Sequence, residues 1–189
     1  MSTVPADSEP VPIRQLSSRL VYRNPWLALR EDRIERQDGS HGIYTVIDRP
    51  DFAVIIPLED EGFHLVSQYR YPTAARFWEF PQGCFPDWRP VVDPIELASA
   101  ELAEETGLRA GSLVDIGRLL GWQGASGQAF NVVLATDLRQ GPTDREIGEQ
   151  DMRHEWFSRT DFDRMIRAGE IRDNSTLAAY SLLMLHERG

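Results

Sequence analysis

The stretch DPIELASAELAEETG, residues 93–107, carries a nearly complete set of signals for one helix. Asp93 suits the capping position before a helix, Pro94 suits the first helical residue, and Glu96 completes an Asp-x-x-Glu capping box. Gly107 suits the C-terminal stop, where the backbone turns left-handed. The stretch therefore predicts a helix that begins after Asp93 and ends before Gly107.

The second half of this helix carries three carboxylates and no neighbouring cation. Helical residues advance by about 100° each, so Glu101, Glu104 and Glu105 fall within roughly a 100° arc, beside an apolar stripe that includes Ala98 and Leu102. Each like-charge pair at this spacing costs about 0.2–0.5 kcal/mol. The arc is either a solvated acidic face or a site for a hard cation, since Mg²⁺ often links one or two carboxylates to a substrate phosphate. The absence of a neighbouring Lys or Arg and the adjacent apolar stripe favour the metal site.

The segments on either side of the helix predict a mixed β sheet. The apolar run FAVIIPL, residues 52–58, indicates a strand buried on both faces. Other strands are expected at 26–36, 41–49, 63–71, 112–122, 128–138 and 154–159, and two later helices at 160–171 and 174–189. Strands mixed with sparse helices favour an α+β fold built as an α/β/α sandwich rather than a doubly wound sheet.

The composition excludes several classes of protein. A formal net charge of −10 over 189 residues argues against a nucleic-acid-binding protein, which would present a basic face. No run of residues approaches the roughly 18 apolar positions of a membrane span. One cysteine excludes an intrachain disulfide, and the four histidines show no zinc-site spacing. We expect a soluble, cytoplasmic protein.

Several segments, in this order along the chain, resemble the Nudix hydrolase superfamily. ELAEETGL, residues 101–108, matches the end of the Nudix box, which reads Arg-Glu-U-x-Glu-Glu-x-Gly-U with U apolar. WEFPQG, residues 78–83, resembles the strand end before the box, and QYRYP (68–72) and NPW (24–26) resemble segments of the ADP-ribose pyrophosphatase branch. The resemblance covers roughly residues 17–189.

The resemblance implies how the chain is divided. It implies a Nudix α/β/α sandwich with a mixed sheet over residues 51–189, preceded by a small antiparallel β region over 17–50. Residues 1–16, rich in Pro, Ser and acidic residues, predict a disordered tail. Relatives in this branch are commonly homodimers whose N-terminal strands cross to the partner and complete its site, so we expect a homodimer with strand exchange.

The chain also departs from the family pattern. The arginine of the box falls on Ala100, and the earlier glutamate of the box falls on Val92. The spacing from Gly83 to Glu101 is three residues too long, which makes CFPDWRPVV, residues 84–92, an expanded loop. These departures leave three alternatives: an active hydrolase, a module that binds a nucleotide without turnover, and a structural remnant.

For an active hydrolase the resemblance implies a reaction and a metal site. The reaction is hydrolysis of the pyrophosphate bond in ADP-ribose or a related nucleoside diphosphate sugar, giving a nucleoside monophosphate and a sugar phosphate. Glu101 and Glu105 would be the principal ligands of Mg²⁺ or Mn²⁺, Glu104 would support or join them, and the backbone carbonyl of Gln82 would add a ligand.

The general base is expected in a later acidic loop, REIGEQD, residues 145–151. Alignment on HEWFSRTDF places Gln150 at the expected position, but a glutamine cannot accept a proton from water. A shift of one residue gives the role to Glu149, which we prefer over Glu146 and Asp151. The alternative is a loop that is merely solvated.

Four other residues are expected to contact the substrate. Arg70 either contacts a phosphate or forms a surface ion pair, and Glu79 lies in the WEFPQG segment. Trp26 and Tyr44 lie on the predicted N-terminal strands, where their rings either stack on adenine or pack in a core. Two tryptophans near the site are left without a role at this stage: Trp88 and Trp122.

Overall fold

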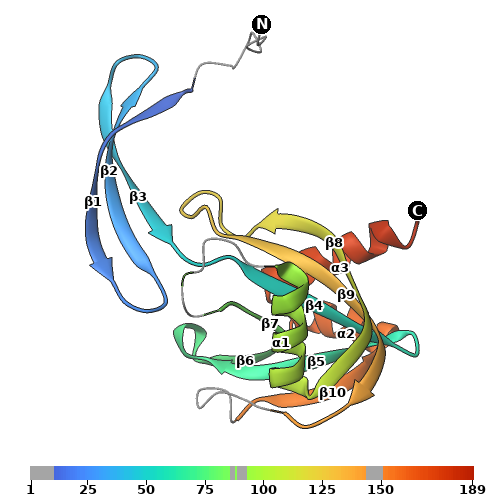
Figure 1. Ribbon diagram of the computed structural model, residues 1–189. Helices are drawn as coiled ribbons and strands as arrows, with labels where there is room; N and C mark the ends of the chain where they lie inside the picture. The colour runs from blue at the N-terminus through green and yellow to red at the C-terminus, as the bar shows by residue number, and fades with distance from the viewer. Residues whose placement is uncertain (1–10, 86–87, 89–92, 144–150) are drawn as a thin grey trace, which may run out of the picture.

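The computed structural model describes residues 11–85, residue 88, and residues 93–143 and 151–189. Its first part is a three-stranded antiparallel sheet in the order β1 (Ile13–Arg23), β2 (Ala28–Arg36) and β3 (His41–Asp48). This sheet, which we call the arm, projects from the rest of the molecule (Figure 1). The predicted antiparallel N-terminal region is thus present, with one strand more than the two predicted.

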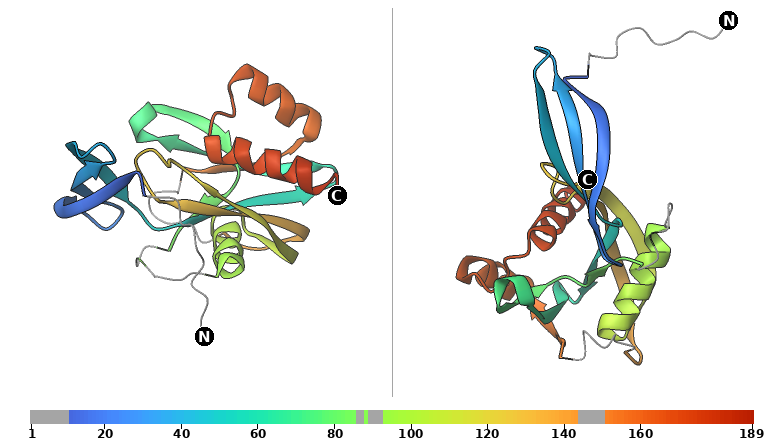
Figure 2. Two further views of the ribbon diagram at one scale, coloured as in Figure 1. Left: turned by 90° about the horizontal axis from the view of Figure 1, so that it is seen from above. Right: turned by 90° about the vertical axis from the view of Figure 1, so that its left-hand side faces the viewer.

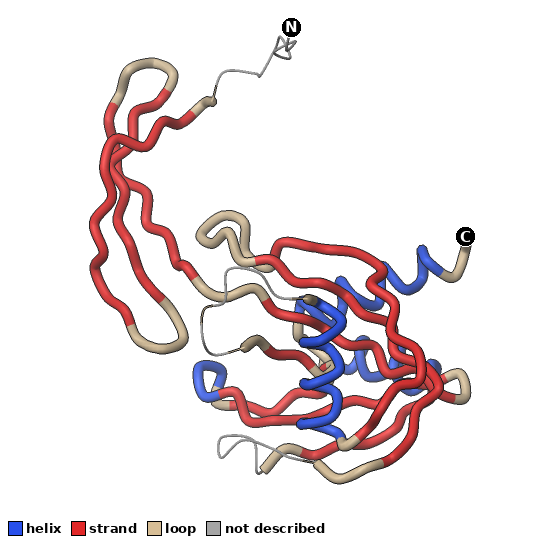
Figure 3. The backbone as a smooth tube through the Cα atoms, viewed as in Figure 1, coloured by secondary structure: helices blue, strands red, loops and turns tan. Residues whose placement is uncertain are grey.

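The second sheet is mixed and has seven strands (Figure 3). Its central path runs β10-β5-β4-β9-β8, while β6 pairs with β5 and β7 pairs with β4. Only the β4–β9 pairing is parallel among the pairings described. The strands are β4 (Phe52–Glu59), β5 (Gly62–Arg70), β6 (Ala75–Glu79), β7 (Gln82–Gly83), β8 (Leu108–Leu120), β9 (Ala129–Gln140) and β10 (Arg153–Ser158).

Helices cover both faces of this sheet, which confirms the predicted α/β/α sandwich. Helix α1 (Pro94–Thr106) lies on one face, and α2 (Arg159–Ala168) and α3 (Asn174–His186) lie on the other (Figure 2, right). A short 3-10 turn, η1 (Tyr71–Thr73), joins β5 to β6. None of the helices within the described ranges is long and apolar enough to cross a membrane.

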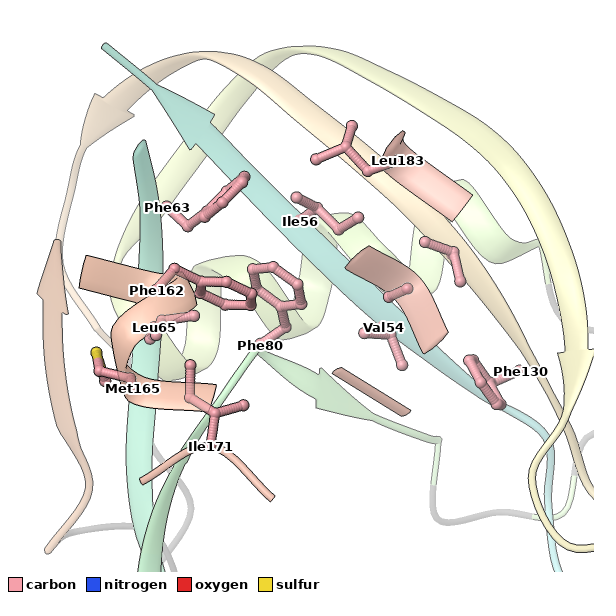
Figure 4. Close-up of a cluster of buried hydrophobic side chains, with 12 residues drawn as sticks. Val54, Ile56, Phe63, Leu65, Phe80, Phe130, Phe162, Met165, Ile171 and Leu183 are labelled. Carbon is pink, nitrogen blue, oxygen red and sulfur yellow. The ribbon is translucent and has the colours of Figure 1, made fainter. Parts of the chain in front are cut away.

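Strand β4 supplies the centre of both hydrophobic layers. Ala53 and Ile55 pack in the cluster beneath α1, whereas Val54 and Ile56 pack in the cluster beneath α2 and α3. Successive side chains of a strand point to opposite faces, so one continuous apolar run serves both layers. Figure 4 shows the second layer, where Phe63, Phe80 and Phe162 pack on one another beside Val54 and Ile56 of β4. The prediction of a strand buried on both faces is confirmed.

The caps of α1 agree with the sequence analysis apart from one detail. Asp93 is the N-cap, Pro94 begins the helix, and Gly107 ends it with a φ of 77°. The Asp93 carboxylate accepts a hydrogen bond from the backbone N–H of Ile95 (2.9 Å), one residue earlier than the N–H of Glu96 that a capping box uses. The predicted helix boundaries are therefore confirmed.

Three strands were not predicted from the sequence. β1 begins at Ile13, within the segment predicted as a tail, and all of its residues are exposed. Its sequence, IRQLSSRLVYR, lacks the alternation between apolar and polar residues that identifies a half-buried strand. β6 and β7 are too short, at five and two residues, to give a periodic pattern. Residues 1–10 lie outside the described part of the chain.

The left-handed residue that ends α1 gives a test of this packing. A Cβ built on Gly107 would lie 2.6 Å from the carbonyl oxygen of Gly141, and the backbone at φ 77° strains any side chain. We expect Gly107→Ala to lower the free energy of unfolding by about 2 kcal/mol in a urea titration. Gly127→Ala is the matched control, because a Cβ there meets nothing within 4 Å. Equal stability of both variants would contradict this packing.

Candidate active site

A cavity of about 760 Å³ opens where the arm meets the sandwich. The arm contributes Trp26, and α1 contributes Ala100, Glu101 and Glu104. The sheet and the loops contribute Arg49, Phe52, Arg70, Gln82, Gly83, Cys84, Phe85, Gly121, Trp122, Gln128 and Asp173, and the start of α3 contributes Asn174 and Ser175. This volume suits a small organic ligand, since ligand sites commonly span about 300–1,000 Å³.

The carboxylates of α1 divide between this cavity and the protein interior. Glu101 and Glu104 are partly exposed and line the cavity, as the predicted arc requires. Glu105 is completely buried, and its Oε2 accepts a hydrogen bond from the backbone N–H of Gln82 at 3.3 Å. Glu105 thus connects α1 to β7 through this hydrogen bond.

The short strand β7 brings Gln82 and Gly83 against α1. It pairs with β4 through Gln82 opposite Val54 and Gly83 opposite Ala53. A Cβ built on Gly83 would overlap the carboxylate of Glu101, so the absence of a side chain at Gly83 leaves room for this carboxylate beside β7. The backbone of β7 and the carboxylates of α1 therefore share one wall of the cavity.

Arg70 and Glu79 form an ion pair between neighbouring strands at this site. Arg70 lines the cavity, and its guanidinium is paired with the carboxylate of Glu79, which also accepts a hydrogen bond from Gln68 Nε2 at 2.9 Å. Glu79 is buried and is not one of the cavity-lining residues. The structure therefore places Glu79 where it holds Arg70. Burial raises the pKa of the Glu79 carboxyl although Arg70 opposes that rise.

The two predicted aromatic contacts differ in position. Trp26 is 68% exposed and lines the cavity, on a turn where Asn24 Oδ1 accepts from the N–H groups of Trp26 (2.9 Å) and Leu27 (2.8 Å). Tyr44 lies outside the described lining, and its hydroxyl donates to the carbonyl of Gly124 at 2.9 Å. In this chain Tyr44 therefore attaches the arm to the loop that carries Trp122.

The predicted base falls largely outside the described residues. Glu146, Glu149 and Gln150 belong to residues 144–150, which the structure does not describe. Val92 in the expanded loop also lies outside the described residues. Asp151 is described, and it is ion-paired with Arg76 of β6 while its backbone carbonyl accepts from the same guanidinium at 3.2 Å. Asp151 is therefore held by Arg76 on β6.

The sequence analysis missed several groups that line the cavity. Arg49 lies between β3 and β4, and Asp173 is the N-cap of α3, where it accepts from the N–H of Thr176 at 2.7 Å. Trp122, which had no assigned role, also lines the cavity. Its Gly-rich surroundings were a usable signal, whereas Arg49 and Asp173 stand in segments whose local pattern resembles any strand or helix boundary.

The donor set at the cavity suits a cation that keeps part of its water shell. Among the described residues, no three Asp, Glu, His or Cys side chains form a ready metal centre. Mg²⁺ in phosphate-handling sites is commonly held by one or two carboxylates together with substrate phosphates and water. Glu101 and Glu104, with the backbone of Gln82 beside them, fit that mode of binding.

Comparison with known proteins identifies the family. The chain is 30% identical over 169 residues, which is 86% of its length and 79% of the relative, to an ADP-ribose pyrophosphatase of Mycobacterium tuberculosis. The chain belongs to the Nudix hydrolase family, in its ADP-ribose pyrophosphatase-like branch. An ADP-ribose pyrophosphatase of Bacillus subtilis is 23% identical over 92% of this chain and 94% of its own.

Two further comparisons concern the arm and the fold of this Nudix hydrolase. Residues 13–47, which form most of the arm, match the nucleoside diphosphate sugar hydrolase N-terminal domain. A solved structure, a crystal structure of an ADP compounds hydrolase, superposes with a TM-score of 0.83 over 97% of this chain and 98% of that chain. Its sequence identity is 19%, so this likeness shows the fold.

The buried Glu79 of the Nudix hydrolase gives a prediction on pH. Its pKa is raised above the ordinary value of 4.5, so its stabilising contribution is complete below that pH and is lost as the pH rises through the folded-state pKa. We expect the free energy of unfolding of the wild type, relative to Glu79→Gln, to fall as the pH is raised from 4 to 7. Urea titrations at several pH values measure this difference. A difference that stays flat, or grows with pH, would contradict the assignment.

Proposed function

We propose that this chain hydrolyses the pyrophosphate bond of ADP-ribose or a related nucleoside diphosphate sugar. The products would be a nucleoside monophosphate and a sugar phosphate. The observation that supports this most strongly is the cavity itself, which combines two carboxylates of the Nudix helix with Arg70 and two exposed indoles, Trp26 and Trp122. The names of the two bacterial relatives point to the same substrate.

The lining residues suit the parts of such a substrate. Arg49 and Arg70 would bind the phosphate oxygens, because a guanidinium donates several hydrogen bonds to one anion. Trp26 and Trp122 would offer flat faces to the base. The attacking water would form a bond to one phosphorus while the bond from that phosphorus to the bridging oxygen breaks, and Glu149 would accept the proton of the water.

The charge of the described lining supports a bound divalent cation. Its two arginines and three acids, Glu101, Glu104 and Asp173, give a formal charge of −1, which repels a diphosphate. Bound Mg²⁺ or Mn²⁺ would neutralise the phosphates and lower the pKa of a bound water. In this proposal Glu101, Glu104 and Glu105 hold the cation, with the backbone carbonyl of Gln82 as a further ligand.

A panel of nucleotides tests the proposed reaction. The protein is incubated with ADP-ribose, other nucleoside diphosphate sugars and dinucleotides, each with Mg²⁺, with Mn²⁺ or with a chelator. We expect AMP and ribose 5-phosphate from ADP-ribose, in equal amounts, with either metal and none with the chelator. No nucleoside monophosphate from any compound, at high protein concentration, would contradict the proposal.

A second candidate function is a module that binds the nucleotide without hydrolysing it. The observation that favours it is Ala100, which lines the cavity where the family pattern has an arginine. Calorimetry with ADP-ribose separates the two functions. Binding that releases heat without any AMP appearing would favour the module, whereas turnover at the same protein concentration would exclude it.

Substitution of the helix carboxylates tests the metal site. We expect Glu101→Gln, Glu104→Gln and Glu105→Gln each to weaken Mn²⁺ binding by at least about 10–100-fold, the loss seen when only an outer-shell partner is removed. Titration of the apoprotein with Mn²⁺, followed by electron paramagnetic resonance, measures the affinity directly. Glu96→Gln is the matched control, because Glu96 lies exposed in the first turn of the same helix. Unchanged affinity in all the variants would show that the carboxylates bind no metal.

We further propose that the arm forms a homodimer. Large apolar side chains are exposed on it, including Leu20 (59%) and Ile43 (62%), and exposed apolar patches mark surfaces that bind a partner. The match of the arm to an N-terminal domain of nucleoside diphosphate sugar hydrolases supports an arm with a function of its own.

Light scattering after size-exclusion chromatography tests the dimer. We expect a mass near twice 21.5 kDa for the wild type and a mass near 21.5 kDa for Leu20→Glu combined with Ile43→Glu. Leu185→Glu is the matched control, because Leu185 is equally exposed (61%) on α3 and not on the arm. A wild type with the mass of one chain, near 21.5 kDa, at all concentrations would contradict the dimer.

A further inference from the structure

Trp88, in the expanded loop, contacts the arm at two points. Its indole Nε1–H donates to the backbone carbonyl of Pro25 at 2.7 Å, and the guanidinium of Arg23 lies over its ring, with Cζ 5.1 Å from the ring centre. Pro25 precedes Trp26, which lines the cavity. Trp88 of the expanded loop therefore contacts the turn that carries Trp26.

The turn needs such support because Trp26 is not held by burial. Its side chain is largely exposed, and Asn24 orders only the backbone of the turn by accepting from Trp26 and Leu27. Because its ring is exposed, the position of Trp26 depends on how firmly the backbone of the turn is held. The contact with Trp88 fixes this backbone against the sandwich.

The arm is also attached to the sandwich through β3. On β3, the N–H of Ile47 donates to the carbonyl of Ala125 (2.8 Å), and the Tyr44 hydroxyl donates to Gly124. The residues that follow the turn pair with the same end of β3, Ala28 with Asp48 and Leu29 with Ile47. Trp88 adds a contact on the turn itself, at Pro25, and this contact helps to define the position of Trp26.

We propose that Trp88 is a positioning residue that holds Trp26 in the cavity and so sets the affinity for the base of the nucleotide. Trp88 thus gives the expanded loop a function of its own, because it supplies a contact with the arm. The ligand part of this inference rests on the proposed function, whereas the position of Trp26 can be measured without any ligand.

The ligand-free test uses fluorine NMR. The chain has five tryptophans, so protein labelled with 5-fluorotryptophan gives five resonances, and the one lost in Trp26→Phe is that of Trp26. We expect Trp88→Phe, which keeps the ring but loses the N–H donor, to shift or broaden the Trp26 resonance, and Trp88→Ala to do so more strongly. Trp156→Phe is the matched control, because Trp156 Nε1 donates in the same way to the carbonyl of Glu59 (3.0 Å) outside the cavity.

An unchanged Trp26 resonance in both Trp88 variants would overturn the proposal. This result does not depend on whether the chain hydrolyses anything, so a failure of the proposed function, seen as no product from the wild type, is separate.

The second test is a double-mutant comparison, by calorimetry with Mg²⁺ present, of the affinity for a non-hydrolysable analogue of ADP-ribose. We expect Trp88→Ala to weaken binding about tenfold, because Trp26 is then no longer held in place for the base. In a Trp26→Ala background the same change should have no further effect, because Trp88 acts through Trp26. Equal losses in the two backgrounds would show that Trp88 does not act through Trp26 and would overturn the proposal.

Discussion

The packing of α1 on β4 is the constraint on which the site depends. Ala98 and Leu102 lie in the same buried cluster as Ala53 and Ile55, so the helix has one orientation on the sheet. In that orientation Glu101 and Glu104 border the cavity, and Glu105 turns inward to accept from the backbone of Gln82. Because β7 also pairs with β4, the strand and the helix that form this wall of the cavity are both positioned by β4.

The departures from the family pattern gain a physical meaning from this arrangement. Ala100 removes a guanidinium from the cavity wall, while Arg49 and Arg70 line other parts of it. Arg70 in turn is held by Glu79, whose burial would be costly without a cation beside it. The expanded loop is connected to the arm through Trp88. The divergent box therefore keeps its carboxylates, and the cationic groups of the site come from outside it.

The fold was largely predictable from the sequence because its signals are local. Asp93, Pro94 and Gly107 are capping signals that hold for any helix, and FAVIIPL is apolar at every position that two covered faces require. β1 had no such signal, because all of its residues are exposed and neither face carries a continuous apolar pattern. Its strand character comes from pairing with β2, which is a long-range interaction that a local pattern does not contain.

The site was predictable in its chemistry but less so in its geometry. Periodicity placed three glutamates on one arc, yet Glu104 and Glu105 are about 100° apart, and the register of α1 on the sheet decides which of them is buried. Tyr44 and Trp26 were equivalent as exposed aromatic residues, and the course of the arm places only Trp26 at the cavity of this chain. Arg49 and Asp173 come from distant loops that the fold brings together.

A structure of the protein with Mn²⁺ and a non-hydrolysable analogue of ADP-ribose tests the central claim most directly, because anomalous scattering locates the metal without assumptions. The account predicts Mn²⁺ at the wall formed by Glu101, Glu104 and Gln82, in contact with the diphosphate, with the base between Trp26 and Trp122. Mn²⁺ bound elsewhere, or a diphosphate out of reach of that wall, would contradict it.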